Sequence, residues 1–183
     1  MPRIKRPYER IKRSVVNQSE RTGGHPRLIV LHATEGHNYV GNRDLKNLGD
    51  YFNNPGVQAS SHVAVDAEGN SAQFVADGKK AWTCAGFNSA SLNIEQIGFS
   101  AQKFWPSAQE RKVAKYCAYW SVKYAIPLRQ AVVNSSGGQV YKSGVCQHSN
   151  LGVYGGNHGD CGPNYPFKRV LRMARFYKKM SFR

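Results

Sequence analysis

Histidine occurs at two places in this 183-residue chain where it could ligate a metal. His32 ends the apolar run RLIVLHAT, and the ends of central strands are where ligands bind in open α/β sheets. His148 lies in a Gly-rich stretch that also holds Asp160 and Cys161. Two imidazoles with one carboxylate or thiolate, and an open fourth position, make up a catalytic zinc site. Zinc lowers the pKa of bound water to about 7 and polarises carbonyls, which suits amide hydrolysis.

Glu95 is the second residue that the pattern singles out for chemistry. It interrupts an apolar strand that contains Leu92, Ile94, Ile97 and Phe99, in a chain with only 11 acidic residues. A carboxylate in such a strand is costly unless it is paired or functional. A structural alternative stays open for each residue: His32 as a hydrogen-bonded strand end, His148 as a surface residue and Glu95 as a carboxylate bound to a backbone turn.

Hydrophobic periodicity predicts the elements that would position these residues. Buried strands are expected at 27–34 and 91–100, two strands joined by a turn at 62–77, helices at 42–54, 107–125 and 167–180, and a loop-like region at 134–166. Residues 1–26 are polar and basic, and we expect them to form an N-terminal arm with some helical content. No repeat or low-complexity linker interrupts residues 27–183, which predicts one α/β domain.

The charge balance is strongly basic, with 26 Lys and Arg residues against 11 Asp and Glu residues and a formal net charge of +15. Such a field attracts polyanions, and composition alone does not choose between nucleic acid and an anionic wall or membrane surface. No apolar run approaches the roughly 18 residues that span a bilayer. The basic start MPRIKRPYERIKR lacks a following apolar segment, so we expect no classical signal peptide.

Four cysteines are present without CxxC spacing, which argues against a structural Cys-type zinc site. Reduced thiols are expected without a secretion signal. Whether Cys146 and Cys161 are bridged is left open.

Four sequence blocks resemble a known enzyme family. The blocks LIVLHATEG, SSHVAVDAEGNSAQFVADGKKAWTCAG, NSASLNIEQIGFS and QHSNLG…GGNHGDCGPNYPF have the order and spacing of zinc-dependent N-acetylmuramoyl-L-alanine amidases. That family includes phage amidases, bacterial recycling and autolytic amidases, and peptidoglycan recognition proteins, and the blocks are most similar in character to phage endolysin domains. The resemblance covers about residues 27–172. It implies a central mixed twisted β-sheet flanked by α-helices, and cleavage of the lactyl–L-alanine amide bond of peptidoglycan.

The resemblance also implies a role for individual residues. His32, His148 and Asp160 match the three Zn²⁺ ligands. The third ligand is Asp in some members and Cys in others, so Cys161 remains an alternative to Asp160. Glu95 matches a glutamate that acts as general base toward water and then as proton donor to the leaving amine.

Further residues match the surroundings of the family's reaction centre. His158 stands where several relatives carry a lysine that faces the developing oxyanion, and an imidazole could donate the same hydrogen bond. Trp82 and Asn88 match a segment that lines the substrate groove. His62 is expected inside the sheet or at the groove floor without a catalytic role, and His25 and His37 are expected to be solvated.

Three other functions compete with this interpretation. They are a non-catalytic peptidoglycan-binding module of the same fold, a zinc carboxypeptidase with Glu35 as a ligand, and a basic nucleic-acid-binding protein. Occupied ligand positions favour the enzyme over the binding module. We therefore expect peptidoglycan as substrate, anionic cell-envelope polymers as partners of the basic surface, no nucleic-acid partner and no membrane span. A phage-type enzyme made in the host cytoplasm and released onto the wall, or a virion-associated one, fits these expectations.

Overall fold

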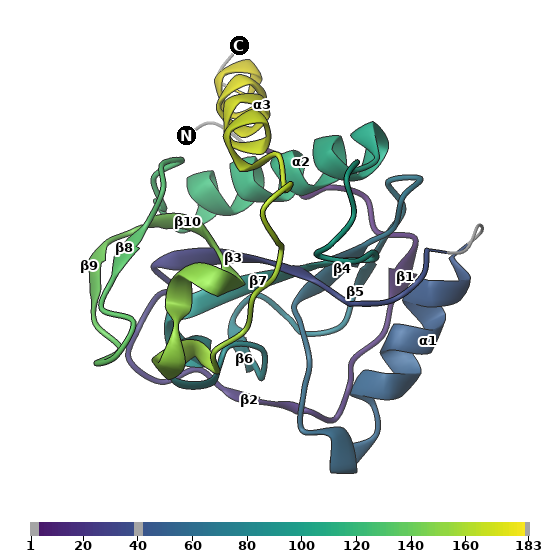
Figure 1. The fold of residues 1–183 in the computed structure, drawn as a ribbon, viewed down its shortest axis with the longest axis horizontal. Helices are drawn as coiled ribbons and strands as arrows, with labels where there is room; N and C mark the ends of the chain where they lie inside the picture. Colours follow the sequence, from purple (N-terminus) through teal and green to yellow (C-terminus); the bar gives the residue numbers. More distant parts are fainter. Residues whose placement is uncertain (1–3, 39–41, 182–183) are drawn as a thin grey trace.

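A six-stranded mixed sheet in the order β1-β5-β4-β7-β3-β10 runs through the middle of the protein (Figure 1). The structure is a computed structural model that describes residues 4–38 and 42–181. The strands of this sheet are β1 (Ile11–Lys12), β3 (Leu28–Ala33), β4 (Val63–Val65), β5 (Ser71–Gln73), β7 (Ser91–Gln96) and β10 (Gly144–Gln147). Two small sheets pair β2 (Gln18–Glu20) with β6 (Lys79–Ala81) and β8 (Val132–Val133) with β9 (Val140–Lys142). The α/β fold with a central mixed sheet agrees with the sequence expectation.

Strand β3 is buried along its whole length, as expected for a central parallel strand that is covered on both faces. Because side chains alternate along a strand, Ile29 and Leu31 pack into one hydrophobic cluster, and Leu28 and Val30 pack into another on the opposite face. His32 lies two positions after Val30 and four after Leu28, so it shares their face of the strand. Its side chain therefore emerges on the face opposite to that of Ile29 and Leu31.

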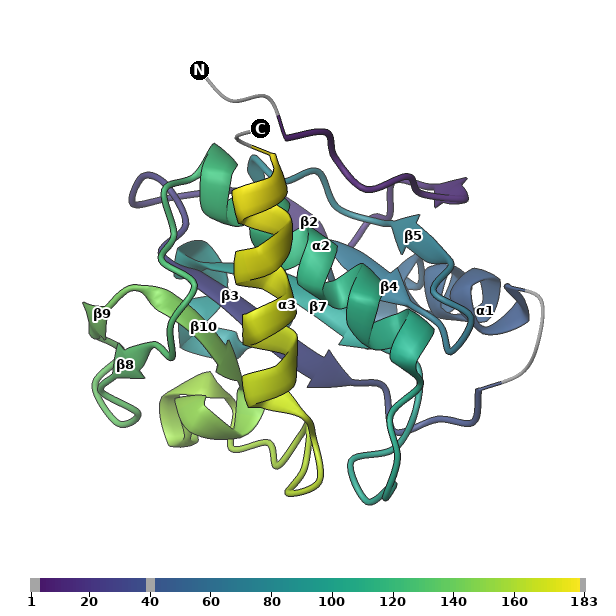
Figure 2. The same ribbon diagram turned by 90° about the horizontal axis from the view of Figure 1, so that it is seen from above.

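Helices cover both faces of the sheet. The helices α2 (Ser107–Lys123) and α3 (Phe167–Met180) pack against each other over the face that carries Ile29 and Leu31, whereas α1 (Arg43–Phe52) lies on the other side (Figures 1 and 2). Short 3-10 helices complete the α1 side: η1 (Pro55–Val57), η2 (Ala85–Ala90), η3 (His148–Leu151) and η4 (Val153–Gly155). All three helices that periodicity predicts are confirmed. No described helix is long and apolar enough to cross a bilayer.

The N-terminal segment is not helical in its described part, contrary to expectation. Strand β1 extends the main sheet by pairing in parallel with β5, and β2 pairs antiparallel with β6. Val15 between them is only 2% exposed and joins a hydrophobic cluster with residues of α1 and β5. Residues 1–3 of the expected arm lie outside the described residues, and the division of the chain after residue 26 stays a prediction.

The region 134–166 is also more regular than its composition suggests. It contains β9 and the edge strand β10, which pairs in parallel with β3 from Gly144 to Gln147. Pairing with β3 is a contact between distant segments, which local composition does not report. Because His148 directly follows β10, this pairing places His148 beside the end of β3.

Candidate metal centre

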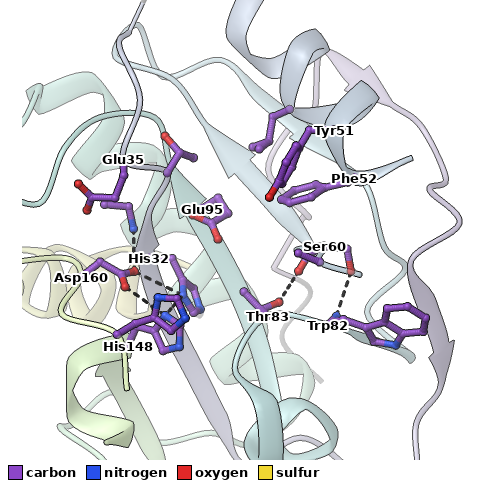
Figure 3. Close-up of a pocket in the computed structure, with 15 residues that line it drawn as sticks. His32, Glu35, Tyr51, Phe52, Ser60, Trp82, Thr83, Glu95, His148 and Asp160 are labelled. Atoms are coloured by element: carbon purple, nitrogen blue, oxygen red, sulfur yellow. Dashed lines mark hydrogen bonds and ion pairs between the residues drawn. The ribbon is translucent and has the colours of Figure 1, made fainter. Parts of the chain in front are cut away.

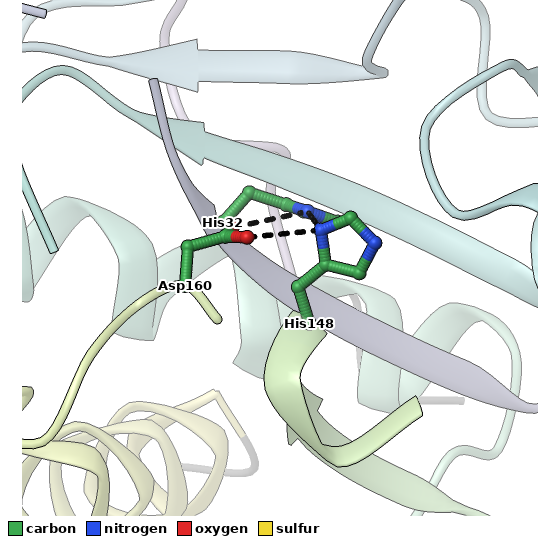
Figure 4. A group of neighbouring side chains, drawn as sticks. All are labelled: His32, His148 and Asp160. Atoms are coloured by element: carbon green, nitrogen blue, oxygen red, sulfur yellow. Dashed lines mark hydrogen bonds and ion pairs between the residues drawn. The ribbon is translucent and has the colours of Figure 1, made fainter. Parts of the chain in front are cut away.

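His32, His148 and Asp160 converge at the ends of β3 and β10 (Figure 4). The His32 Nδ1 lies 3.0 Å from the His148 Nδ1 and 3.6 Å from the Asp160 Oδ2, and the His148 Nδ1 lies 3.1 Å from the Asp160 Oδ1. One ligand atom from each of the three residues lies within 4.8 Å of the others. Ligand atoms about 2.1 Å from a tetrahedral zinc ion would be about 3.4 Å apart, so the spacing fits zinc.

The outer nitrogen of each imidazole is held by a hydrogen-bond acceptor. His32 donates from Nε2 to the Asn93 Oδ1 at 3.1 Å, and His148 donates from Nε2 to the Gly155 carbonyl at 2.9 Å. With Nε2 of each ring directed at an acceptor, Nδ1 is the ring nitrogen of both histidines that faces the cluster. This is how second-shell groups orient histidine ligands for a metal.

The protonation states that burial and contacts favour also suit a metal. Burial lowers the pKa of His32, so the ring is neutral. Burial alone would raise the pKa of Asp160, but its close contacts with His148 and His32 outweigh burial and hold that pKa well below its ordinary value. A neutral imidazole and an ionised carboxylate are the states in which these groups bind zinc.

Asp160 and Cys161 occupy different environments although they are adjacent. The Asp160 Oδ2 accepts a hydrogen bond of 3.0 Å from the Ala33 amide beside the cluster. Cys161 is fully buried in the hydrophobic cluster under α2 and α3, where its sulfur lies 3.5 Å from the Gln96 Nε2. Burial raises the pKa of the Cys161 thiol well above its usual range. The structure therefore groups Asp160, not Cys161, with the histidines. All four cysteines are free thiols, so Cys161 is not bridged to Cys146.

Glu95 lies beside the metal cluster because β7 pairs with β3 in a register that places it opposite His32. Its carboxylate lines a cavity of about 290 Å³ that the three candidate ligands also line (Figure 3). The Glu95 Oε2 atom is buried without a hydrogen-bond partner in the described chain. Burial, and then the charges of Asp160 and Glu35, raise the pKa of Glu95 to about 8. A carboxyl group of this kind can accept and return a proton near neutral pH.

The other expected site residues are placed as follows. His158 is exposed, lines the cavity and stacks on the His148 ring at a centroid distance of 4.5 Å. Trp82 lines the cavity on the side away from His148 and Asp160 (Figure 3), and its indole nitrogen donates to the Ser19 hydroxyl at 3.0 Å. Asn88 lies outside the cavity lining. Its side-chain oxygen accepts from the amides of Thr83 and Cys84, so it shapes the turn that carries Trp82.

The remaining histidines stand apart from the cavity. His62 is fully buried, and its Nδ1 accepts from the Asn93 amide at 3.1 Å, which agrees with an interior position. His25 and His37 are exposed, and the His37 ring contacts Phe99 edge to face.

Several residues of the site were not expected from the sequence. Asn93, the partner of His32, is a polar residue inside a buried strand, and that pattern could have revealed it. Glu35 lines the cavity but is not one of the grouped ligands, and its carboxylate accepts from the Ser100 amide at 3.1 Å. This placement does not support the zinc carboxypeptidase layout. The lining residues that the sequence did not single out are Ala33, Thr34, Leu48, Tyr51, Phe52, Ala59, Ser60 and Thr83.

Solved structures with a similar fold include several amidases. The Staphylococcus aureus hydrolase AmiA, solved with its ligand, is 18% identical with a TM-score of 0.70 over 97% of this chain and 86% of its own. AmpD is 17% identical with a TM-score of 0.69 over 94% and 98%, and the Clostridium intestinale endolysin amidase LysCS is 14% identical with a TM-score of 0.61 over 92% and 97%. At these identities the likeness shows the fold.

Sequence comparison is more specific about the family. No curated protein matches the chain. Residues 22–163, most of the chain and all of the cavity lining, match the family model described as N-acetylmuramoyl-L-alanine amidase. The protein therefore belongs to the N-acetylmuramoyl-L-alanine amidase family.

Proposed function

We propose that this protein is a zinc-dependent peptidoglycan hydrolase that cleaves the amide bond between the lactyl group and the L-alanine of the stem peptide. The observation that carries the proposal is the cluster of His32, His148 and Asp160 beside the unpartnered carboxylate of Glu95, in a cavity open to solvent. Family membership supports the substrate class. The Zn²⁺ ion itself is part of the proposal.

Each residue of the site has a role that follows from its position. His32, His148 and Asp160 would hold the ion, which when bound polarises the scissile carbonyl and makes water a nucleophile at neutral pH. Glu95 would accept the proton of the attacking water and return it to the alanine nitrogen as the amide bond breaks. His158 is placed at the rim beside His148, where its imidazole could donate a hydrogen bond to the developing oxyanion. Trp82 would contact the substrate at the other end of the cavity.

The direct test is digestion of purified cell walls by the purified protein, with and without a chelator. Mass spectrometry should find a free lactyl carboxyl group and a free L-alanine amine among the products. Activity should disappear with the chelator and return with zinc. Intact glycan-peptide links after prolonged digestion with zinc would contradict the proposal and would favour a non-catalytic binding module.

The Glu95→Gln variant tests the proton-transfer role separately from metal binding. We expect turnover to fall by about 10² to 10⁴, because the amide cannot accept a proton, while the zinc content stays near one ion per chain. Metal analysis and product formation measured on the same preparation would check this. Near-normal turnover with zinc bound would remove Glu95 from the mechanism.

The finer biological role that we propose is that of a phage-type endolysin, acting on the host wall after release from the cytoplasm or carried by the virion. The name of the similar LysCS structure, an endolysin amidase, supports this choice. Lysis of host cells from outside, compared with lysis when the protein is expressed with a membrane-permeabilising partner, would test it. Binding of the basic surface to anionic envelope polymers belongs to the same proposal.

A further inference from the structure

The outer face of α3 has a composition that the amidase reaction does not use. This 14-residue helix contains six basic residues and no acidic residue. Its exposed positions recur at the spacing of one helix face, and they are Lys168, Arg169, Arg172, Arg175, Phe176, Lys179 and Met180. The neighbouring α2 carries four basic residues and one acidic residue, Glu110. The two helices together therefore present a strongly positive side of the molecule.

Two large apolar side chains lie within this basic stripe. Phe176 is 59% exposed and Met180 is 49% exposed, although other apolar residues of α3 are buried against the core. They are four positions apart, so they are neighbours on the helix surface. A face that only repels other proteins, or only steers a soluble polyanion, does not need an exposed apolar pair.

Part of the positive charge is not used inside the protein. Arg169 forms an ion pair with Glu110, and the Arg175 Nε donates to the Leu128 carbonyl. The side chains of Lys168, Arg172 and Lys179 have no hydrogen bond or ion pair with any residue in 4–38 or 42–181. These three cations are therefore free to face an external anion.

The stripe and the cavity lie on opposite sides of the sheet. The side chain of His32 emerges on the face opposite to Ile29 and Leu31, over which α2 and α3 pack, and the cavity is lined from the α1 side by Leu48 and Tyr51 (Figures 1 and 3). A surface bound to the outer face of α3 would leave the cavity open and pointing away from it.

We propose that the outer face of α3 docks on the surface of an anionic lipid bilayer. Phe176 and Met180 enter the headgroup region, while Lys168, Arg172 and Lys179 face lipid phosphates. A helix face that combines aromatic and basic residues suits such an interface, because the apolar side chains leave water while anionic lipid attracts the cations. A soluble wall polymer or a nucleic acid would satisfy the cations but would leave the apolar pair in water, so we favour the bilayer.

Vesicle co-sedimentation of the full chain tests this directly. Vesicles of phosphatidylcholine with roughly one third phosphatidylglycerol should bind the protein, whereas pure phosphatidylcholine vesicles should not. The variant F176S/M180S should weaken binding about tenfold, because apolar area no longer leaves water. The variant R172Q/K179Q should weaken it to a similar extent at about 0.1 M salt and less at about 0.5 M salt.

Y141S/K142Q is the matched control, because it removes one exposed apolar and one exposed basic residue from β9. It should bind vesicles as the unaltered protein does. All the variants should keep their melting temperature and their rate on a soluble muropeptide, since none of the residues lines the cavity.

Two results would overturn the proposal. One is equal binding of the unaltered protein to neutral and anionic vesicles, or to neither. The other is that R172Q/K179Q loses vesicle binding while F176S/M180S binds as well as the unaltered protein. That result would identify a purely electrostatic surface for a soluble polyanion. Vesicle binding without any amidase activity would contradict the proposed function and leave this inference standing.

Discussion

Asp160 and Cys161 are adjacent in the chain, but Asp160 lies in the metal cluster and Cys161 in the hydrophobic core. Their substitutions should therefore affect different properties. Asp160→Ala should abolish stoichiometric zinc binding, because only two imidazoles would remain to hold the ion. Cys161→Ser should keep its zinc and lose stability by about 1–3 kcal/mol, because a hydroxyl replaces a thiol in an apolar cluster. Metal analysis after dialysis and urea unfolding would check both. Zinc loss in the Cys161 variant alone would make the thiol the third ligand.

Asn93 is the second residue whose role can be isolated. Its side-chain oxygen holds the His32 ring in the orientation that points Nδ1 at the cluster. Asn93→Ala should therefore weaken zinc affinity about 10- to 100-fold, as loss of a second-shell partner typically does. Competition with a chromogenic chelator would measure the affinity without relying on activity. Ser89→Ala, at a half-buried partner of Thr22 outside the cavity lining, is a control that should leave zinc affinity unchanged.

At the scale of elements, a tyrosine joins the loop of His148 to the rest of the protein. The Tyr154 ring on η4 packs over Gly86 of η2 and Gly138, and an added Cβ would come within 2.0 Å and 2.2 Å of that ring. Gly86→Ala should expel the ring and cost about 1–3 kcal/mol of unfolding free energy. Gly78→Ala is a suitable control, since nothing lies within 4 Å of its added Cβ.

A double-mutant cycle would show whether the ring is the cause. Tyr154→Ala alone should lose a similar amount of stability, and adding Gly86→Ala to it should cost little more, because the clash is gone. Urea unfolding of the four proteins measures the coupling. Additive losses would mean that Gly86 is required for another reason.

The elements that the sequence predicts are those with a strong local pattern. The strands around Ile29 and Ile94 and the helix containing Trp120 have enough apolar residues at one period to be recognised without a partner. Strands β1, β2 and β10 have two to four residues each, and pairing with distant segments makes them strands. Local composition reports a loop at these places because the deciding contacts are not local.

The candidate site likewise combines residues that the sequence identifies with contacts that only the structure reveals. His32 and Glu95 could be identified because each breaks an apolar strand, and His148 because it shares a Gly-rich stretch with Asp160 and Cys161. The resemblance to a family then favoured Asp160 as the third ligand. The structure brings all four residues to one cavity. The role of Asn88 in shaping a turn, and the hydrogen bond between Asn93 and His32, depend on side-chain orientation. Residue spacing alone contains no such information.

At the scale of the whole molecule, the N-terminal segment is tied to the domain by buried charges. Arg6 donates to Asp77, which lies between β5 and β6, and the Lys123 ammonium of α2 binds the second oxygen of the same carboxylate. Arg21 further along donates to the carbonyls of Lys79 and Ser89. A detached basic arm would leave such cations in water. The segment instead closes one edge of the fold.

Asp77 allows a test of this arrangement through pH. It is 4% exposed, and although burial alone would raise the pKa of Asp77, the charges of Arg6 and Lys123 outweigh burial and hold it below its ordinary value. A depressed pKa in the folded state means that ionised Asp77 stabilises the fold above the unfolded-state pKa of about 3.9. That contribution is lost as the pH falls through the lower folded-state pKa.

Asp77→Asn should therefore lower the free energy of unfolding by about 3 kcal/mol near neutral pH, because two cations lose a buried partner. The difference from the unaltered protein should begin to narrow as the pH falls below about 4, where the aspartate of the unfolded chain becomes protonated, and should vanish only below the lower folded-state pKa, where both states are protonated. Urea unfolding across this pH range would measure it. Asp50→Asn is the matched control, since its pair with Arg13 is exposed and should contribute less than about 1 kcal/mol. Equal stability of the Asp77 variant at neutral pH would show that these ion pairs do not hold the N-terminal segment in place.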